Sequence, residues 1–350
     1  FNFSTRCLYD SVSSYEPPVS EDVYDGKTVL LSRRYSPHNA GHMVLETAIP
    51  LEKLASIYGI TDIASRVILF DDDCFDNHSI HWHEGNNTFR RNSCASFSEN
   101  YVAPLSGVPL QTYKDLERIA AEQNRRFLSF ADVVVGLSEF SPWNHLGTCE
   151  YCITGWDRTM DQSIKSWRDH LYVRSGVPLS KSLERKLVTF IYKVGRRSVL
   201  NYAAVINFLS DWSMEYNYEF RFMNLASTPF NYQVQTLSET DILLTQAGSS
   251  GKSALLLREK STVIHFTPLD YDPTEKVFMK GHDVVDIVTN HVSFFRMLEY
   301  INWQPPHSTW DVVMDLNDTS DIIANYKLRG ASYNVDMTVL RKMMFDAAMI

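Results

Sequence analysis

The segment Gly248-Ser-Ser-Gly251-Lys252-Ser253 joins small residues to a lysine in the order that phosphate-binding loops use. A β-branched run, Asp241–Leu244, precedes it, and a helical pattern begins near Lys252. Such a turn brings free backbone N–H groups and the positive end of a helix to one point. The segment therefore predicts an anion site formed by Gly248, Ser249, Ser250, Gly251, Lys252 and Ser253. A tight strand-to-helix connection without a ligand is the alternative.

The phosphate-loop motif is incomplete. Gly-x4-Gly-Lys-Ser requires its first glycine at position 246, where the chain has Gln246. The segment also comes late in its domain, whereas this loop usually follows the first strand. ATP or GTP hydrolysis is therefore the weaker hypothesis, and it would require Mg²⁺-dependent ATP binding that depends on Lys252.

Composition limits the classes of partner. The chain has 350 residues and a net charge of −9, with no long basic run, so duplex nucleic acid is not expected to bind. Short arginine pairs such as Arg196-Arg197 suit a phosphate better. No apolar run reaches the roughly 20 residues that cross a bilayer. Because the sequence begins at Phe1, we expect that a signal or a membrane anchor can precede these residues.

Short β-branched runs alternate with helical patterns, which predicts parallel sheets covered by helices. The fold class is thus α/β, with a Rossmann-like N-terminal domain over residues 1–176 and a second one over residues 177–334. A helix over residues 335–350 can pack back on the first domain. Predicted strands are Lys27–Ser32, Arg66–Phe70, Asp132–Gly136, Leu187–Tyr192, Phe220–Leu225, Asp241–Leu244 and Thr262–Phe266. Predicted helices are His42–Tyr58, Leu110–Asn124, Trp156–Arg174, Tyr202–Trp212, Tyr232–Leu237, Ser253–Arg258, Val284–Tyr300 and Asp336–Met349.

Six short pieces, in order, resemble the motifs of one enzyme family. They are Asn39-x2-His42-x3-Glu46, Lys193-x3-Arg197-x-Val199-x-Asn201, Phe230-Asn-Tyr-Gln233, Asp241-Ile-Leu243, Ala247-Gly-Ser-Ser250 and Val263-Ile-His265. Their order and spacing are similar to those of glycosyltransferase family 61, which includes plant xylosyl- and arabinosyltransferases and animal N-acetylglucosaminyltransferases acting on protein O-glycans. The chain departs from that family at Ala247, where the family has histidine, and at His265, where it has glutamate.

The resemblance implies a GT-B fold, in which two Rossmann-like doubly wound domains face each other across a cleft. It implies an inverting, metal-independent glycosyltransferase that moves a sugar from a nucleotide sugar, most simply a UDP sugar, to a glycan or glycoprotein hydroxyl, without a further cofactor. The residues that would bind the donor are Lys193, Arg196, Arg197, Asn201, the segment Gly248 to Ser253, and His265. Asn39 would bind the acceptor. Trp143 lies in the aromatic segment Ser138–His145, which follows a predicted strand of the first domain, and could stack on a sugar ring or pack in the core.

Such a transfer needs a base for the acceptor hydroxyl and cations or N–H groups for the leaving diphosphate. His42 is the first candidate base, because Glu46 lies one helical turn later and can orient its ring. Glu46 itself is the second. Asn39 can cap the same helix. Arg197 and Lys193 can hold the diphosphate, and surface salt bridges are the alternative role for them.

Other residue clusters suggest other functions. Asp71, Asp72 and Asp73 at a strand end could hold Mn²⁺ in a GT-A glycosyltransferase, or form a plain turn. A zinc site could use residues of the histidine-rich segment, namely His78, His81, His83 and Glu84. Cys149 and Cys152 could form a local disulfide or stay as thiols. The departures at Ala247 and His265 also allow an inactive, glycosyltransferase-like binding protein.

Four Asn-x-Ser/Thr sequons, at Asn2, Asn77, Asn86 and Asn317, permit a secretory location. The resemblance implies the lumen of the Golgi or endoplasmic reticulum in a eukaryote, and the cytoplasm in a microbe.

Overall fold

The computed structural model describes residues 22–34, 37–75, 88–125, 128–136, 158–180, 186–194, 198–246, 248–266, 269–272, 277–280, 296–300 and 333–349. The chain divides into two compact units, Phe1–His170 and Leu171–Ile350. Each unit contains a parallel sheet with helices, so the α/β class with two parallel sheets is confirmed. The division falls within a helix, a few residues before the predicted boundary between residues 176 and 177. None of the helices described is long and apolar enough to cross a membrane.

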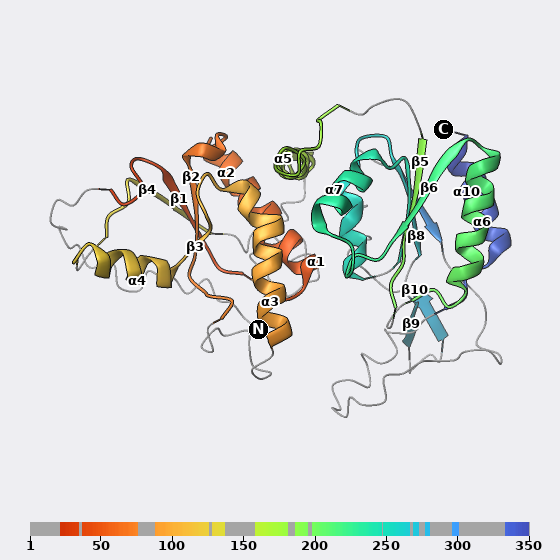
Figure 1. Cartoon of the computed structure of the whole chain (residues 1–350), viewed down its shortest axis with the longest axis horizontal. Coiled ribbons are helices and arrows are strands. Elements are labelled where there is room, and N and C mark those ends of the chain that lie inside the picture. The colour runs from red at the N-terminus through yellow and green to blue at the C-terminus, as the bar shows by residue number, and fades with distance from the viewer. Residues whose placement is uncertain are drawn as a thin grey trace. The chain divides into compact units, whose positions relative to one another are not determined.

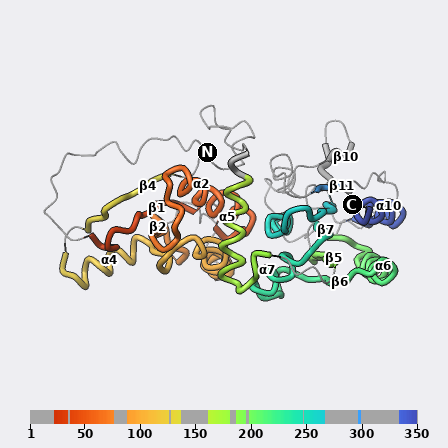
Figure 2. The backbone as a smooth tube through the Cα atoms, turned by 90° about the horizontal axis from the view of Figure 1, so that it is seen from above, coloured from red at the N-terminus to blue at the C-terminus, as the bar shows by residue number. Residues whose placement is uncertain are grey.

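The sheet of unit 1 has four parallel strands in the order β3-β2-β1-β4. Their bounds are β1 Thr28–Ser32, β2 Arg66–Phe70, β3 Gln111–Thr112 and β4 Asp132–Val135. Figure 2 shows β2, β1 and β4 side by side. The order matches the first four strands of a Rossmann fold, in which the switch point lies between the strands equivalent to β1 and β4.

One long helical stretch follows β1 in unit 1. It consists of α1 Ala40–His42, the π-helical segment η1 Met43–Ala48 and α2 Ile49–Ile57, so the predicted helix is present with a π-helical segment near its start. Glu52 of α2 accepts a hydrogen bond from buried Arg66 of β2 at 2.5 Å, which ties this helix to the sheet. The remaining helices of this unit are η2 Ile63–Ser65, α3 Thr88–Phe97, η3 Ser98–Val102, η4 Ala103–Leu105, α4 Tyr113–Glu122 and α5 Arg158–Arg174, which continues into unit 2.

A disulfide joins Cys74, just after β2, to Cys94 of α3, and both residues are buried. The sequence patterns did not predict this pairing, and the Cys149 and Cys152 pair that they did suggest lies outside the described residues. The bond fixes α3 to the carboxyl edge of the sheet.

The main sheet of unit 2 has five parallel strands in the order β11-β8-β7-β5-β6. Their bounds are β5 Lys186–Ile191, β6 Tyr218–Met223, β7 Ile242–Gln246, β8 Thr262–Phe266 and β11 Arg296–Tyr300. Counted along the chain from β5, the order is 2-1-3-4-5, which is the other common doubly wound arrangement. Its switch point lies between β5 and β7.

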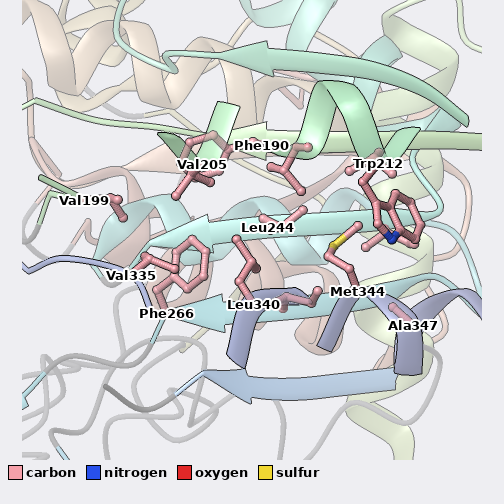
Figure 3. Close-up of a cluster of buried hydrophobic side chains, with 14 of the residues drawn as sticks. Phe190, Val199, Val205, Trp212, Leu244, Phe266, Val335, Leu340, Met344 and Ala347 are labelled. Carbon is pink, nitrogen blue, oxygen red and sulfur yellow. The ribbon is translucent and has the colours of Figure 1, made fainter. Parts of the chain in front are cut away.

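Helices cover both faces of this sheet (Figure 1). The helices are α6 Tyr202–Glu215, α7 Phe230–Glu239, the 3-10 helix η7 Ser249–Leu256 and α10 Met337–Ala348. Figure 3 shows the apolar core on the α6 face, where Phe190, Leu244 and Phe266 of the strands meet Trp212 of α6 and Met344 of α10. A separate antiparallel pair, β9 Leu269–Asp272 and β10 Val277–Lys280, completes the described strands.

The predicted helix Val284–Tyr300 is wrong over residues 296–300. Arg296–Tyr300 forms β11, paired in parallel with β8 from Arg296↔Thr262 to Tyr300↔Phe266. The pairing partner decides the state of this segment, because the five residues Arg-Met-Leu-Glu-Tyr are too few for their periodicity to distinguish a helix from a strand. The other residues of that predicted helix, 284–295, lie outside the described residues.

The C-terminal helix α10 was expected to pack back on the N-terminal domain. Its buried residues Leu340, Met344 and Ala347 lie instead in the core of unit 2. Asp336 caps the helix by accepting from the backbone N–H of Thr338 at 2.8 Å.

We expect reduction of the Cys74–Cys94 bond to destabilise unit 1. A disulfide that closes a loop of about 20 residues contributes about 3 kcal/mol, because it restricts the unfolded chain. Urea unfolding with and without a reductant measures the change. Without reductant, the Cys74→Ala/Cys94→Ala double variant should already be less stable than the oxidised wild type, and adding the reductant should not change its stability. An equal response of both proteins would contradict the assignment.

Candidate functional site

The carboxyl edge of the unit 2 sheet brings together two segments that the sequence singled out. Parallel pairing of β5 with β7 makes both strands end at the same edge. Lys193 follows β5, and Gly248 follows β7. From β5 the chain passes to β6 on one side, and from β7 to β8 on the other. Ligands of open α/β sheets bind where neighbouring connections diverge in this way.

The turn after β7 has the backbone of an anion site. Gly248 has φ 106° and ψ −160°, a left-handed conformation that glycine adopts without strain. It allows η7 to begin at once, and the Gly251 N–H donates to the Gly248 carbonyl at 2.9 Å. Ser249 and Ser250 precede that bond, so their N–H groups have no acceptor within the helix. Ser249 is exposed, whereas Ser250 is buried, with its hydroxyl donating to the Gln246 carbonyl at 2.7 Å.

The connection after β5 leads to the start of the long helix α6. Its N-cap residue Asn201 makes no side-chain cap. The Asn201 amide instead donates to the Val335 carbonyl and accepts from the Val335 N–H, both at 2.8 Å. The first-turn N–H groups of α6 thus lack their usual side-chain acceptor, and half-buried Lys193 lies on the same connection. Asn201, predicted to bind the donor, holds the C-terminal segment with both polar atoms of its side chain.

Two predicted donor-binding residues point into the protein. Lys252, with 7% of its surface exposed, is part of η7, and burial lowers the pKa of its ammonium from 10.5 to about 7. His265 is fully buried in β8. Side chains alternate along a strand, so His265 lies on the α7 face, opposite the core residues Ile264 and Phe266. Gly251 and Ser253 are also buried, which leaves Gly248 and Ser249 as the accessible part of the turn.

Gln246 is a polar residue that the sequence patterns did not assign to a site. It is 1% exposed, and neither atom of its side-chain amide has a hydrogen-bond partner among the described residues. It ends β7 on the α6 face. Tyr333 bridges to Val199, and its hydroxyl donates at 3.3 Å to the carbonyl of Phe266, the residue of β8 that pairs with Gln246. An orphaned buried amide costs about 1–3 kcal/mol, which a polar ligand or water can recover. In the sequence, the only sign that marked this position was that Gln246 stands where the phosphate-loop motif has its first glycine.

The carboxyl edge of unit 1 carries the predicted acceptor and base residues. The Asn39 side chain accepts from the Gly41 N–H at 2.9 Å, so the predicted cap is confirmed. His42 Nδ1 lies 3.0 Å from Glu46 Oε1, and about a quarter of the histidine side chain is exposed, while the Glu46 side chain is buried. His42 directly precedes the π-helical segment η1, and Glu46 belongs to it. Such segments are frequent at functional sites.

The His42–Glu46 contact brings a carboxylate beside the imidazole, as in a general base with an orienting carboxylate, at ion-pair distance but without the angles of a hydrogen bond. A carboxylate at Nδ1 leaves Nε2 as the nitrogen that takes a proton. Burial raises the pKa of the Glu46 carboxyl, although its contact with His42 acts in the opposite direction. Glu46 Oε2 has no hydrogen-bond partner among the described residues. A carboxylate with a raised pKa is also a stronger base.

The aspartates after β2 are each paired with a cationic side chain. Arg33 binds Asp71 at 2.7 Å, and Lys114 binds Asp73 at 3.1 Å. Buried Arg34 donates from Nε to both carboxylate oxygens of Asp72, at 3.1 and 2.9 Å. Its other nitrogens donate to the Ser98 hydroxyl and the Asp72 carbonyl, each at 3.0 Å. These pairs favour a structural role for the three aspartates over metal binding. The described residues contain no cluster of three metal-ligating side chains.

Several predicted site residues lie outside the described residues. They are Trp143, Arg196, Arg197 and Ala247, together with His78, His81, His83 and Glu84 of the alternative zinc site and Cys149 and Cys152.

No family model matches the chain, and no curated protein matches its sequence.

We predict that Asp72→Asn destabilises the protein by about 3–5 kcal/mol, because it leaves the Arg34 guanidinium buried without its countercharge. Asp71→Asn, which breaks the more exposed pair, should cost less than about 1 kcal/mol. Chemical denaturation of both variants measures the difference. If both variants lost the same small amount of unfolding free energy, the buried Arg34–Asp72 pair would not stabilise the fold.

Lys252→Met should be more stable than the wild type at pH 7, with the difference shrinking toward pH 10.5. The folded-state pKa is about 7 and the ordinary value is 10.5, so between these values the unfolded chain binds one more proton. Wild-type stability therefore rises with pH across this window, by about 1.4 kcal/mol per pH unit. Denaturation at several pH values measures how the unfolding free energy of the wild type and of the Met variant depends on pH. A Met variant less stable than the wild type at pH 7 would contradict the burial of a costly ammonium.

Proposed function

We propose that the protein is an inverting, metal-independent glycosyltransferase that uses a nucleotide sugar, most simply a UDP sugar, and a glycan or glycoprotein hydroxyl as acceptor. One observation carries the proposal. At the β5–β7 switch point, two segments with N–H groups suited to an anion meet at one sheet edge: the turn at Gly248 and the start of α6, which has no side-chain cap. Two such segments suit the two phosphates of a nucleoside diphosphate.

The leaving diphosphate would be stabilised by N–H groups and by nearby cations. Lys193 lies on the β5–α6 connection, and Arg196 and Arg197 follow it in the sequence. The N–H groups of Ser249 and Ser250 would complete the cradle. Burial of Lys252 and His265 makes direct contact of these two side chains with the diphosphate less favourable than contact of the backbone.

The acceptor would bind at the carboxyl edge of unit 1, where His42 would take the hydroxyl proton. Glu46 would hold the imidazole and stabilise its charged form, as a buried carboxylate does beside a catalytic histidine. A GT-B arrangement, with the two domains facing each other across the substrates, is part of the proposal, as is the resemblance to glycosyltransferase family 61.

A secretory location fits this function. The buried Cys74–Cys94 disulfide favours an oxidising compartment such as the endoplasmic reticulum or Golgi lumen.

The second candidate is an inactive, glycosyltransferase-like binding protein. It is favoured by the complete burial of His265, which stands where the related family has a glutamate. Such a protein could keep the fold and lose the reaction.

We expect UDP to bind with a dissociation constant on the order of micromolar, measured by calorimetry without added metal. Lys193→Ala should weaken binding about 10- to 100-fold, because it removes a charge-assisted contact to phosphate. Arg197→Ala should act in the same direction. Lys186→Ala, at the amino end of the same strand β5, is the matched control and should bind UDP like the wild type.

If the protein bound no nucleotide, the proposal that it is a glycosyltransferase would be rejected. Tight UDP binding, combined with no hydrolysis or transfer of any sugar in a panel of UDP sugars, would favour the inactive binding protein.

A further inference from the structure

Three aromatic residues form a cluster at the carboxyl edge of unit 2. Tyr192 directly follows β5, Tyr202 is the first residue of α6, and Phe222 lies near the end of β6. The rings of Tyr192 and Tyr202 are nearly parallel, at an angle of 11°, with centroids 6.1 Å apart. The centroids of Tyr192 and Phe222 are 5.9 Å apart. Three different elements thus contribute one ring each, and we call this cluster the aromatic platform.

Two rings of the platform expose apolar surface that the fold does not bury, whereas Tyr192 is partly buried against the unit 2 core. Tyr202 is 49% exposed and Phe222 is 53% exposed. Phe220, two positions earlier on the same side of β6, packs on the unit 2 core, whereas Phe222 does not belong to that core. Single exposed aromatics are ordinary on protein surfaces, but a cluster from three elements at a ligand-binding edge is a site for a flat ring.

The surroundings of the platform favour a ring that carries phosphate. Tyr202 begins α6, whose first N–H groups have no side-chain cap. Lys193 follows Tyr192 directly. A nucleotide presents a flat base, then a ribose, then phosphates, so its base and its phosphates need neighbouring sites of these two kinds.

We propose that the aromatic platform of Tyr192, Tyr202 and Phe222 stacks the base of the nucleotide, while the start of α6 and Lys193 bind its phosphates. This assignment rests on the proposed function and adds to it the residues that hold the base. Stacking on an aromatic side chain contributes about 1–3 kcal/mol per base and depends little on which base is bound. The platform therefore supplies affinity, and hydrogen bonds at the base edge would select the base.

The test compares ligands with and without a base. Tyr202→Leu and Phe222→Leu keep apolar bulk and remove the ring. Each should raise the dissociation constant for UDP about 5- to 100-fold and leave that for inorganic pyrophosphate unchanged. Phe345→Leu is the matched control, because Phe345 is an exposed ring of α10 that contacts Tyr216 just before β6, near the amino edge of the sheet. It should change neither affinity.

Saturation-transfer NMR separates this proposal from the proposed function. Uridine, cytidine, guanosine and adenosine monophosphates are added in turn to the wild type and to Tyr202→Leu. Base-proton signals that depend on Tyr202 support the platform, even if UDP is not the preferred ligand. If UDP binds equally well to the wild type and to both leucine variants, the platform assignment is wrong and the UDP site stands. If no monophosphate shows a base-proton signal, the platform is likewise rejected.

Discussion

The parallel hydrogen bonding between β5 and β7 is the constraint on which the candidate site depends. It makes two strands that are distant in sequence end side by side, with their connections leaving in opposite directions. Lys193 and Gly248 share an edge for this reason alone. The same rule acts in unit 1, where β1 pairs in parallel with β4, and the residues that follow β1 include Asn39 and His42. Each unit thus places its polar candidates at a topological position rather than in a continuous motif.

Both faces of the unit 2 sheet bury apolar side chains, and the α7 face also buries several polar ones. On the α6 face, apolar residues of β5, β7, β8, α6 and α10 form one core, with Gln246 at its edge. The α7 face buries Thr189, Thr245 and His265 of the strands, and the adjoining η7 buries Lys252. Buried polar groups add less to folding than apolar packing does, and a buried ammonium opposes it. Leu187, Leu243 and Val263 are buried on the α7 face as well, so apolar packing stabilises both faces of the sheet, and the buried polar groups of the α7 face contribute less. Proteins commonly accept such a cost beside functional sites.

Sequence patterns predicted the strands well where burial alone decides the structure. Arg66–Phe70 and Thr262–Phe266 were predicted with the bounds that they have, because buried parallel strands form short apolar runs. The turn at Gly248 was predicted from its small residues and adopts the left-handed backbone that glycine permits. Residues 296–300 were assigned wrongly, because their state depends on pairing with β8. Contacts between distant segments determine three further features: the burial of Lys252, the Cys74–Cys94 pairing and the aromatic platform. Local spacing in the sequence does not reveal such contacts.

The role of backbone groups explains how a site could persist while its motif changes. Asn201 stands at a motif position of the family that the sequence resembles, yet its side chain binds Val335. Gln246 stands where a phosphate loop has glycine, and Ala247 stands where the family has histidine. None of these replacements removes an N–H group from the turn or from the start of α6. An anion site made of amides depends on φ and ψ, and among the described residues of that turn, 248–253, Gly248 alone has a conformation that favours glycine. If the proposed donor site is correct, side-chain divergence would alter which nucleotide sugar binds before it abolished diphosphate binding.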